Sequence, residues 1–280
     1  MASSLAFVPE GRSYPVVFPS RQGSALLDRL AHMPKLAGIT PASRLGVRPA
    51  PAMVSSGIGA IDTLTGGLPC GCLTEICGPV SSGRTSILLA ALAASAQRQE
   101  VAALVDTTDG FDPQSAAATG VTFERLLWVR CGQSHPSQRY RDTEKERHFM
   151  DQLERALRVI DLLLQSGGFG LVAMDFSDVP FQAVRRIPLT SWFRFQRAVE
   201  HTPTVLLVIT PAPCTQACAA LLLQLRSSPK GISGQKCDRE GPAHAQLFQG
   251  LQIEAELLRS RLERKPARAV TFDTRAVRAG

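Results

Sequence analysis

The apolar residues of this chain fall into runs that alternate with amphipathic segments. VAALVD at 101–106, FGLVAMD at 169–175 and TVLLVIT at 204–210 are nearly continuous apolar stretches. Such runs are typical of parallel strands that are buried on both faces of a sheet. Further strands are predicted at Leu73–Cys77 and at RLLWVR, residues 125–130.

Helical patterns lie between these strands. RTSILLAALAASAQRQ, residues 84–99, is rich in strong helix formers. Residues 143–168 have apolar positions at helical spacing, open on a capping box of Thr143 and Glu146, and end in Gly-Gly. Shorter helices are predicted near Pro113–Thr119 and at LTSWFRFQRAVEH. Alternating strands and helices imply right-handed crossovers and a parallel sheet, and so an α/β fold.

The two ends of the chain have a different character. Residues 1–50 are rich in Pro, Gly, Ser and Arg, with one short amphipathic helix at SALLDRLAHM. We interpret them as an N-terminal arm, either a solvated extension or a segment for partner docking or self-association. Residues 51–280 form the predicted core domain. After residue 211, a short helical piece with LLLQLR, then LQIEAELLRSRL and ARAVTFD, suggests hairpin strands added to the sheet edge.

The composition narrows the class of protein but does not indicate a function. The chain has 280 residues, 44% hydrophobic and 20% charged, which is ordinary for a soluble globular protein. Its net charge of +7 permits a nucleic acid or an acidic partner without requiring one. We expect no signal peptide, no membrane contact and a cytoplasmic location. The seven cysteines are scattered, without C-x-x-C spacing, and are expected to be buried thiols rather than a zinc site.

One short segment carries candidate chemistry. GPVSSGRTS has the spacing of the phosphate-binding loop G-x-x-x-x-G-K-[ST], but an arginine replaces the lysine. Glycines let the backbone N–H groups approach phosphate, and the helix N-terminus adds anion affinity. Either this loop binds ATP or ADP, or it is a structural relic. The candidate nucleotide-binding residues are Gly78, Pro79, Val80, Ser81, Ser82, Gly83, Arg84, Thr85 and Ser86.

The order of these segments resembles the RecA-type recombinase ATPase core. GIGAIDTLTGGLPCGCLTEICGPVSSGRTS is similar to the family's approach to its phosphate loop, and VDTTDGFDPQSAAATGV to its second strand and the helix after it. LVAMD and VLLVIT stand where the second acidic motif and the sensor strand belong. IEAELLRSRLERKPARAVTFD resembles the closing basic hairpin. The resemblance covers about residues 54–275 and implies a RecA-like core domain.

The departures from that family bear on catalysis. Thr108 stands at the position of the family's water-activating glutamate, and Thr210-Pro211 replaces the sensor Asn-Gln. We therefore expect no ATPase activity, or a very weak one, and no catalytic residue; Asp106 or Asp109 would be the first candidate base if hydrolysis were brisk. Thr85 and Asp175 are candidate Mg²⁺ ligands, with a turn cap as the alternative role for the aspartate.

The basic C-terminal hairpin is the candidate DNA contact. Arg259, Arg261, Arg264 and Lys265 are expected to bind phosphate weakly, the alternative being a solvated face balanced by neighbouring glutamates. The family's two DNA loops shrink here to SDVPFQAVRRIPLT and PAPCTQA, which argues against strand exchange. The aromatic residues of SWFRFQR could stack on bases, but a core role is favoured.

Shortened loops and eroded motifs resemble one group in particular, the ImuA-like RecA relatives of bacterial mutagenesis cassettes. This resemblance implies a binding and regulatory role in the DNA-damage response, with a protein partner from the translesion polymerase machinery. Two alternatives remain open: an active DNA-dependent ATPase of recombinational repair, and a structural scaffold with an empty nucleotide pocket. Arg84 and Thr108 argue against the ATPase.

Overall fold

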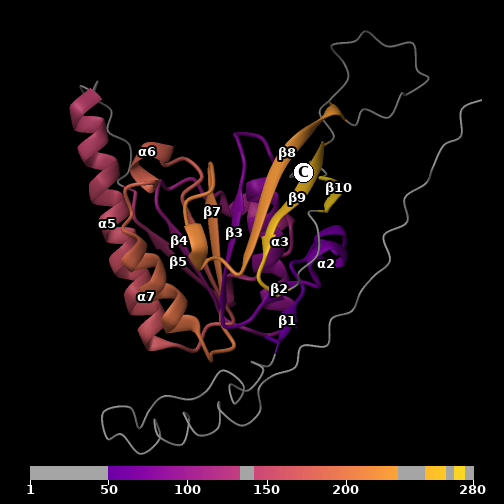
Figure 1. Ribbon diagram of the computed structural model, residues 1–280, viewed down its shortest axis with the longest axis horizontal. Coiled ribbons are helices and arrows are strands. Elements are labelled where there is room, and N and C mark those ends of the chain that lie inside the picture. Colours follow the sequence, from indigo (N-terminus) through magenta and orange to yellow (C-terminus); the bar gives the residue numbers. More distant parts are fainter. Residues whose placement is uncertain (1–49, 133–141, 233–249, 263–267, 275–280) are drawn as a thin grey trace, which may run out of the picture. The chain divides into compact units, whose positions relative to one another are not determined.

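The computed structural model describes residues 50–132, 142–232, 250–262 and 268–274 (Figure 1). Within them, the side chains of residues 142–146 and 228–232 are not described. The predicted N-terminal arm with its helix therefore lies outside the described residues, as do Arg264 and Lys265.

An eight-stranded sheet organises the described part of the chain. Its strand order is β10-β9-β8-β3-β7-β6-β4-β5, and the strands from β8 to β5 are parallel. β9 and β10 extend the sheet in antiparallel pairing, which confirms the α/β fold with C-terminal hairpin strands. The strands are β3 Cys72–Cys77, β4 Ala102–Asp106, β5 Leu126–Arg130, β6 Leu171–Asp175, β7 Val205–Thr210, β8 Leu221–Ile232, β9 Leu251–Ser260 and β10 Ala269–Asp273, with a separate pair β1 Met53–Val54 and β2 Leu68–Pro69.

Helices cover both faces of the sheet (Figure 1). The helices are α2 Gly59–Thr65, α3 Arg84–Gln97, α4 Pro113–Ala118, α5 Asp142–Ser166, α6 Phe181–Val184 and α7 Leu189–Val199, with 3₁₀ turns η3 Phe123–Arg125 and η4 Gln216–Cys218. One core joins α2, α3 and α4 to the sheet, and the other joins α5, α6 and α7 to the opposite face. Central strands supply both cores, because successive side chains of a strand point to opposite faces.

The continuous apolar runs have a direct structural cause. In β4, Leu104 belongs to the α3 core, while Ala103 and Val105 belong to the α5 core. β7 divides its side chains in the same way, and all six of its residues are buried. A central strand of this kind has no face exposed to solvent. Its sequence therefore lacks the alternation of apolar and polar residues that a half-exposed strand has.

Helix boundaries follow local chemistry where they are described. The Asp112 carboxylate accepts the N–H groups of Gln114 and Ser115, and Pro113 is the first residue of α4. α5 ends at Ser166, directly before Gly167 and Gly168, which both have left-handed φ, as the Gly-Gly pattern predicts. The capping box of α5 lies among side chains that are not described.

The region after residue 211 corrects one prediction. In its described residues the helical part is limited to η4, and LLLQLR opens β8, which pairs parallel to β3. The aromatic residues of α7 follow the favoured core interpretation in part: Trp192 and Phe195 are buried against each other, with ring centroids 6.1 Å apart. Phe193 is 45% exposed.

β9 sets a steric limit on the start of α3. A Cβ atom at Gly83 would overlap Cδ1 of Ile253, a fully buried β9 side chain, and Gly83 also has a φ of +89°. We expect Gly83→Ala to lower the free energy of unfolding by about 2–4 kcal/mol, from overpacking and from the left-handed backbone.

Combining Gly83→Ala with Ile253→Ala should cost less than the sum of the two single changes, because the smaller side chain removes the overlap. Urea unfolding of the four proteins measures this. Gly59→Ala is the control, since nothing lies within 4 Å of a Cβ there. Strict additivity would contradict the steric explanation.

Candidate nucleotide-binding site

The candidate site lies where four parallel strands end. Register pairs Asp106 of β4 with Asp175 of β6, and Cys77 of β3 with Thr210 of β7, so their carboxyl ends share one edge of the sheet. The 14-residue helix α3 begins at the same edge, directly after β3. Ligands of open α/β sheets bind at this edge, and the amino end of a helix favours anions.

The loop between β3 and α3 has a backbone that requires its glycines. A Cβ at Gly78 would lie 2.5 Å from Ser82 Oγ and 2.6 Å from the Leu225 carbonyl oxygen. Ser81 has a φ of +61°, and Gly83 is the left-handed residue that precedes α3. The Gly78 N–H donates to the Thr210 carbonyl at 3.2 Å, which ties the loop to β7.

Exposure differs sharply along this loop. Pro79, Ser81 and Thr85 are exposed, and Val80 is 79% exposed at the tip. Ser82 is buried, and among the described residues its hydroxyl has no hydrogen-bond partner. Such a group is costly unless a ligand or water satisfies it, so the loop offers both accessible and unsatisfied donors.

Arg84 does not lie free at this loop. The side chain is 6% exposed, and its Nη1 donates to the Ser177 carbonyl at 3.1 Å. Burial lowers the pKa of the guanidinium, while the carboxylates of Asp175 and Asp178 raise it. Arginine stays charged in proteins, so a buried positive charge links α3 to the loop after β6.

Asp175 ends β6 in a partly buried position. Its Oδ1 accepts the Ser177 N–H at 2.9 Å, the turn cap that was the alternative role for this residue. Burial raises the pKa of the carboxyl group, hydrogen bonds from Ser177 lower it, and the charges of Asp106 and Asp178 raise it further. A nearby cation would favour the charged carboxylate.

Mg²⁺ fits this edge only with help from a nucleotide. The Thr85 hydroxyl and the Asp175 carboxylate are oxygen donors of the kind Mg²⁺ takes. Among the described residues, no group of three or more His, Cys, Asp and Glu side chains could hold a metal. Phosphate and water oxygens would have to complete the coordination shell.

The carboxylate at the end of β4 is occupied by its own loop. Asp106 accepts the N–H groups of Gly110 and Phe111, each at 3.0 Å, and the indole N–H of Trp128 at 3.2 Å. Asp109 forms a two-pronged ion pair with Arg130. Both acidic side chains beside Thr108 therefore serve the structure of this loop.

Glu75 is a buried carboxylate that helps to shape the site, and the sequence analysis missed it. It is 1% exposed in the middle of β3 and accepts the N–H groups of Cys214 at 2.7 Å and Thr215 at 3.1 Å. The hydroxyls of Thr210 and Thr215 donate to the same carboxylate. The only signal in the sequence is a lone glutamate inside the strand LTEIC. The Thr210 hydroxyl therefore donates to a buried carboxylate of β3, and the same carboxylate holds the segment after β7 against β3.

Two of the predicted DNA contacts, Arg259 and Arg261, are described, and they lie away from this edge. Arg259 pairs with Leu222, which pairs in turn with Glu75, so it is level with the middle of β3. Its Nη1 donates to the Gln216 carbonyl. Arg261 is exposed just beyond the end of β9.

Two further basic residues lie in the segment that follows the carboxyl end of β6. Arg185 and Arg186 are exposed and follow α6, in the segment that joins the carboxyl end of β6 to α7 (Figure 1). The sequence analysis did not assign them a role.

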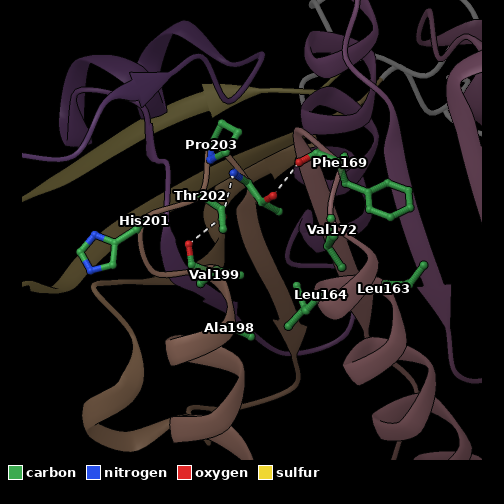
Figure 2. Close-up of a pocket in the computed structure, with 12 residues that line it drawn as sticks. Leu163, Leu164, Phe169, Val172, Ala198, Val199, His201, Thr202 and Pro203 are labelled. Carbon is green, nitrogen blue, oxygen red and sulfur yellow. Dashed lines mark hydrogen bonds between the residues drawn. The ribbon is translucent and has the colours of Figure 1, made fainter.

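An apolar cavity of about 220 Å³ occupies the opposite edge, at the start of β6 and β7 (Figure 2). Leu164 and Phe169 contribute to its walls. The Thr202 hydroxyl donates to the Val199 carbonyl at 2.7 Å, and the Thr204 hydroxyl to the Phe169 carbonyl at 2.6 Å. Both hydroxyl groups therefore already have backbone partners.

The described cysteines are free thiols. Cys131, Cys214 and Cys218 are buried as predicted, and Cys77 is buried with a pKa raised to about 12, by burial and by the Glu75 charge, whereas Cys70 and Cys72 are only half-buried. In the described ranges, no helix combines the length and the apolar character needed to cross a membrane.

Known proteins are similar to part of this chain. Residues 30–139 match the family model of the RecA N-terminal domain. Protein RecA of Salinispora tropica is 35% identical over 161 residues, 56% of this chain and 40% of that protein. Protein RecA of Kineococcus radiotolerans is 33% identical over 161 residues, 56% of this chain and 41% of that protein. Protein RecA of Lactococcus lactis subsp. cremoris is 33% identical over 162 residues, 56% of this chain and 37% of that protein.

This chain thus spans about two fifths of the length of these relatives. Together with the mostly parallel sheet and the loop before α3, the similarities support a RecA-like family.

Glu75 can be tested without any ligand. We expect Glu75→Gln to lower the free energy of unfolding by about 1–3 kcal/mol, because an amide cannot accept from all four donors. Hydrogen exchange at Cys214 and Thr215 should rise. Glu254→Gln, an exposed change on β9, is the control. Unchanged exchange at both amides would refute the role of Glu75 in holding this segment.

Proposed function

We propose that this chain is a RecA-like protein of DNA repair with a binding and regulatory role, in which loop 78–86 holds ATP or ADP without efficient turnover. The observation that carries the proposal is the contrast between the two sides of the site. The loop has a glycine-dependent backbone and an exposed Thr85, whereas the Asp106 carboxylate at the end of β4 already accepts from Gly110, Phe111 and Trp128.

Binding depends on groups that remain available. The amino end of α3 and the loop amides supply anion affinity whatever residue follows Gly83. Thr85 and Asp175 would hold Mg²⁺ beside the phosphates, and the ion would neutralise phosphate charge there. Hydrolysis also needs a positioned water, and Thr108 has no basic group to activate one.

The cellular role follows from similarity and from what the site lacks. Similarity to RecA proteins supports DNA repair, and the weak catalytic apparatus favours an ImuA-like role in the DNA-damage response and translesion synthesis. In this proposal the protein is cytoplasmic. Residues 1–50 contact a partner of the polymerase machinery, and the same arm supports self-association.

A second candidate, a scaffold with an empty nucleotide pocket, is favoured by one observation. Arg84 already has a partner in the Ser177 carbonyl and is buried. Nucleotide binding separates the two candidates.

We expect calorimetry to detect Mg-ADP and Mg-ATP binding that Thr85→Val weakens by about tenfold or more, since a hydrogen bond to a charged group contributes about 1.5–3 kcal/mol. Thr190→Val, at an exposed position of α7, is the control. Gly83→Asp is a poorer probe, because it also collides with Ile253. No heat at millimolar nucleotide would favour the scaffold.

Turnover is expected to stay near background in Arg84→Lys. A general base contributes about 10²–10⁴ in rate, and Thr108 cannot supply it. Arg84→Lys with Thr108→Glu should exceed either single change, since both groups act on one transition state. Steady-state phosphate release of the four proteins measures this. Brisk hydrolysis by the unmodified protein would mean that another residue acts as the base.

DNA binding is expected to be weak and salt-dependent, without strand exchange. Neutralising Arg259 and Arg261 should lower the slope of log K against log salt by about 0.9 for each lost duplex contact. The matched variant Arg185→Ala with Arg186→Ala removes the same charge at two exposed positions after α6. Efficient strand exchange, or an unchanged slope in both variants, would contradict this part of the proposal.

A further inference from the structure

The cavity at the opposite edge of the sheet lies between the last turns of α5 and α7 (Figure 2). Its lining residues fall into two groups. The exposed ones, at its rim, are Gly167, Gly168, His201 and Pro203. The buried apolar ones, at its floor, are Leu163, Leu164, Val172 and Val199. An apolar space with an exposed rim can receive a group from outside the molecule.

The cavity suits an apolar group of limited size. An apolar cavity of about 150 Å³ accommodates benzene, and this cavity measures about 220 Å³. The hydroxyls of Thr202 and Thr204 already donate to backbone carbonyls, so neither has a hydrogen left for a polar ligand. One side chain of the size of leucine or phenylalanine is therefore the group that fits.

Basic side chains lie beside the cavity. Arg194 and Ala198 are one turn apart on α7, and Ala198 lines the cavity, so Arg194 lies on the same side of the helix. Arg194 forms a two-pronged ion pair with Asp161 of α5, at 2.8 and 2.6 Å. Arg197 is exposed and has no hydrogen-bond or ion-pair partner among the described residues. Its charge remains available to a partner.

The helix layer on this side of the sheet carries an excess of positive charge. Within residues 147–166 and 181–199, the exposed acidic residues are Asp151 and Glu154. The exposed basic residues of the same ranges are Arg147, Arg155, Arg158, Arg185, Arg186, Arg194 and Arg197. A surface of this sign attracts and orients an acidic partner.

Two large apolar side chains belong to the same two helices. Leu162 is 66% exposed and Phe193 is 45% exposed. They are the sequence neighbours of Asp161 and Arg194, the ion pair that joins α5 to α7. A phosphate backbone has no apolar group to cover them, whereas protein interfaces combine apolar anchors in pockets with a polar rim.

We propose that the cavity and the basic outer surface of α5 and α7 form a docking site for an acidic protein segment, which places one bulky apolar side chain, Leu or Phe, in the cavity. Carboxylates of that segment pair with Arg197 and Arg158. Docking at this edge requires no nucleotide at loop 78–86, and it uses the core domain rather than residues 1–50.

The chemistry of the partner is tested by fluorescence polarisation of the full-length protein with short labelled peptides. One peptide has Asp, Glu and Ser around a central Phe; a second has Ser in place of Phe; a third has Asn and Gln in place of the acids. The first should bind about fivefold or more tightly than the other two, because it alone supplies both the anchor and the charge. Equal binding of the first two peptides, or no binding of the first at millimolar concentration, would overturn the proposal.

Substitutions locate the site. Ala198→Leu fills the cavity from its wall and should weaken binding of the first peptide about fivefold or more. Ala198→Met replaces it if leucine lowers the unfolding temperature, since methionine adapts to irregular spaces. Arg197→Glu should weaken binding about two- to fivefold, as expected for an exposed charge pair. Arg268→Glu, the same change at an exposed position directly before β10, is the control. Equal effects at Arg197 and Arg268 would mean attraction by net charge alone and would overturn the site.

Two other occupants would give different results. DNA binding that Arg197→Glu abolishes and Ala198→Leu leaves intact, without peptide binding, would assign the surface to phosphate. A dimer in analytical ultracentrifugation that Ala198→Leu dissociates, again without peptide binding, would assign the cavity to a second copy of this chain. Either result would overturn the acidic segment as the partner.

Discussion

A charge inside a protein must be satisfied by hydrogen bonds or by an opposite charge, and the carboxyl edge of this sheet is built under that constraint. Glu75 is satisfied by the segment after β7, Asp106 by the loop after β4, and Arg84 by the loop after β6. Each of these side chains fixes the start of one segment at the edge. The arrangement of the candidate site follows from these three contacts.

The same constraint decides which groups are left for chemistry. A carboxylate that holds two backbone N–H groups and an indole cannot easily serve as a base, so Asp106 is structural. A buried arginine with a carbonyl partner is not a ready phosphate ligand. Backbone amides, the amino end of α3 and the exposed Thr85 remain available. This composition is the basis of the proposal that the edge holds an anion without cleaving it.

Much of the fold could be predicted because it depends on period and composition. β4 and β7 are buried on both faces, so their continuous apolar runs identified them as central strands. α3 and the end of α5 carried their own signals in helix formers and in Gly-Gly. LLLQLR was ambiguous, because a short apolar run fits a helix or a strand until its neighbours are known. Pairing with β3 decided it.

The sequence by itself determined the α/β alternation, the loop spacing from Gly78 to Thr85 and the absence of a carboxylate at Thr108, because these are properties of local residues and their order. Only the tertiary structure decided the hydrogen-bond partners of three side chains. Arg84 donates to the loop after β6, Asp106 accepts from the loop after β4, and Glu75 accepts from the segment after β7. Those partners lie up to 140 residues away along the chain. A hydrogen bond depends on distances of a few ångströms, and only folding brings such residues together.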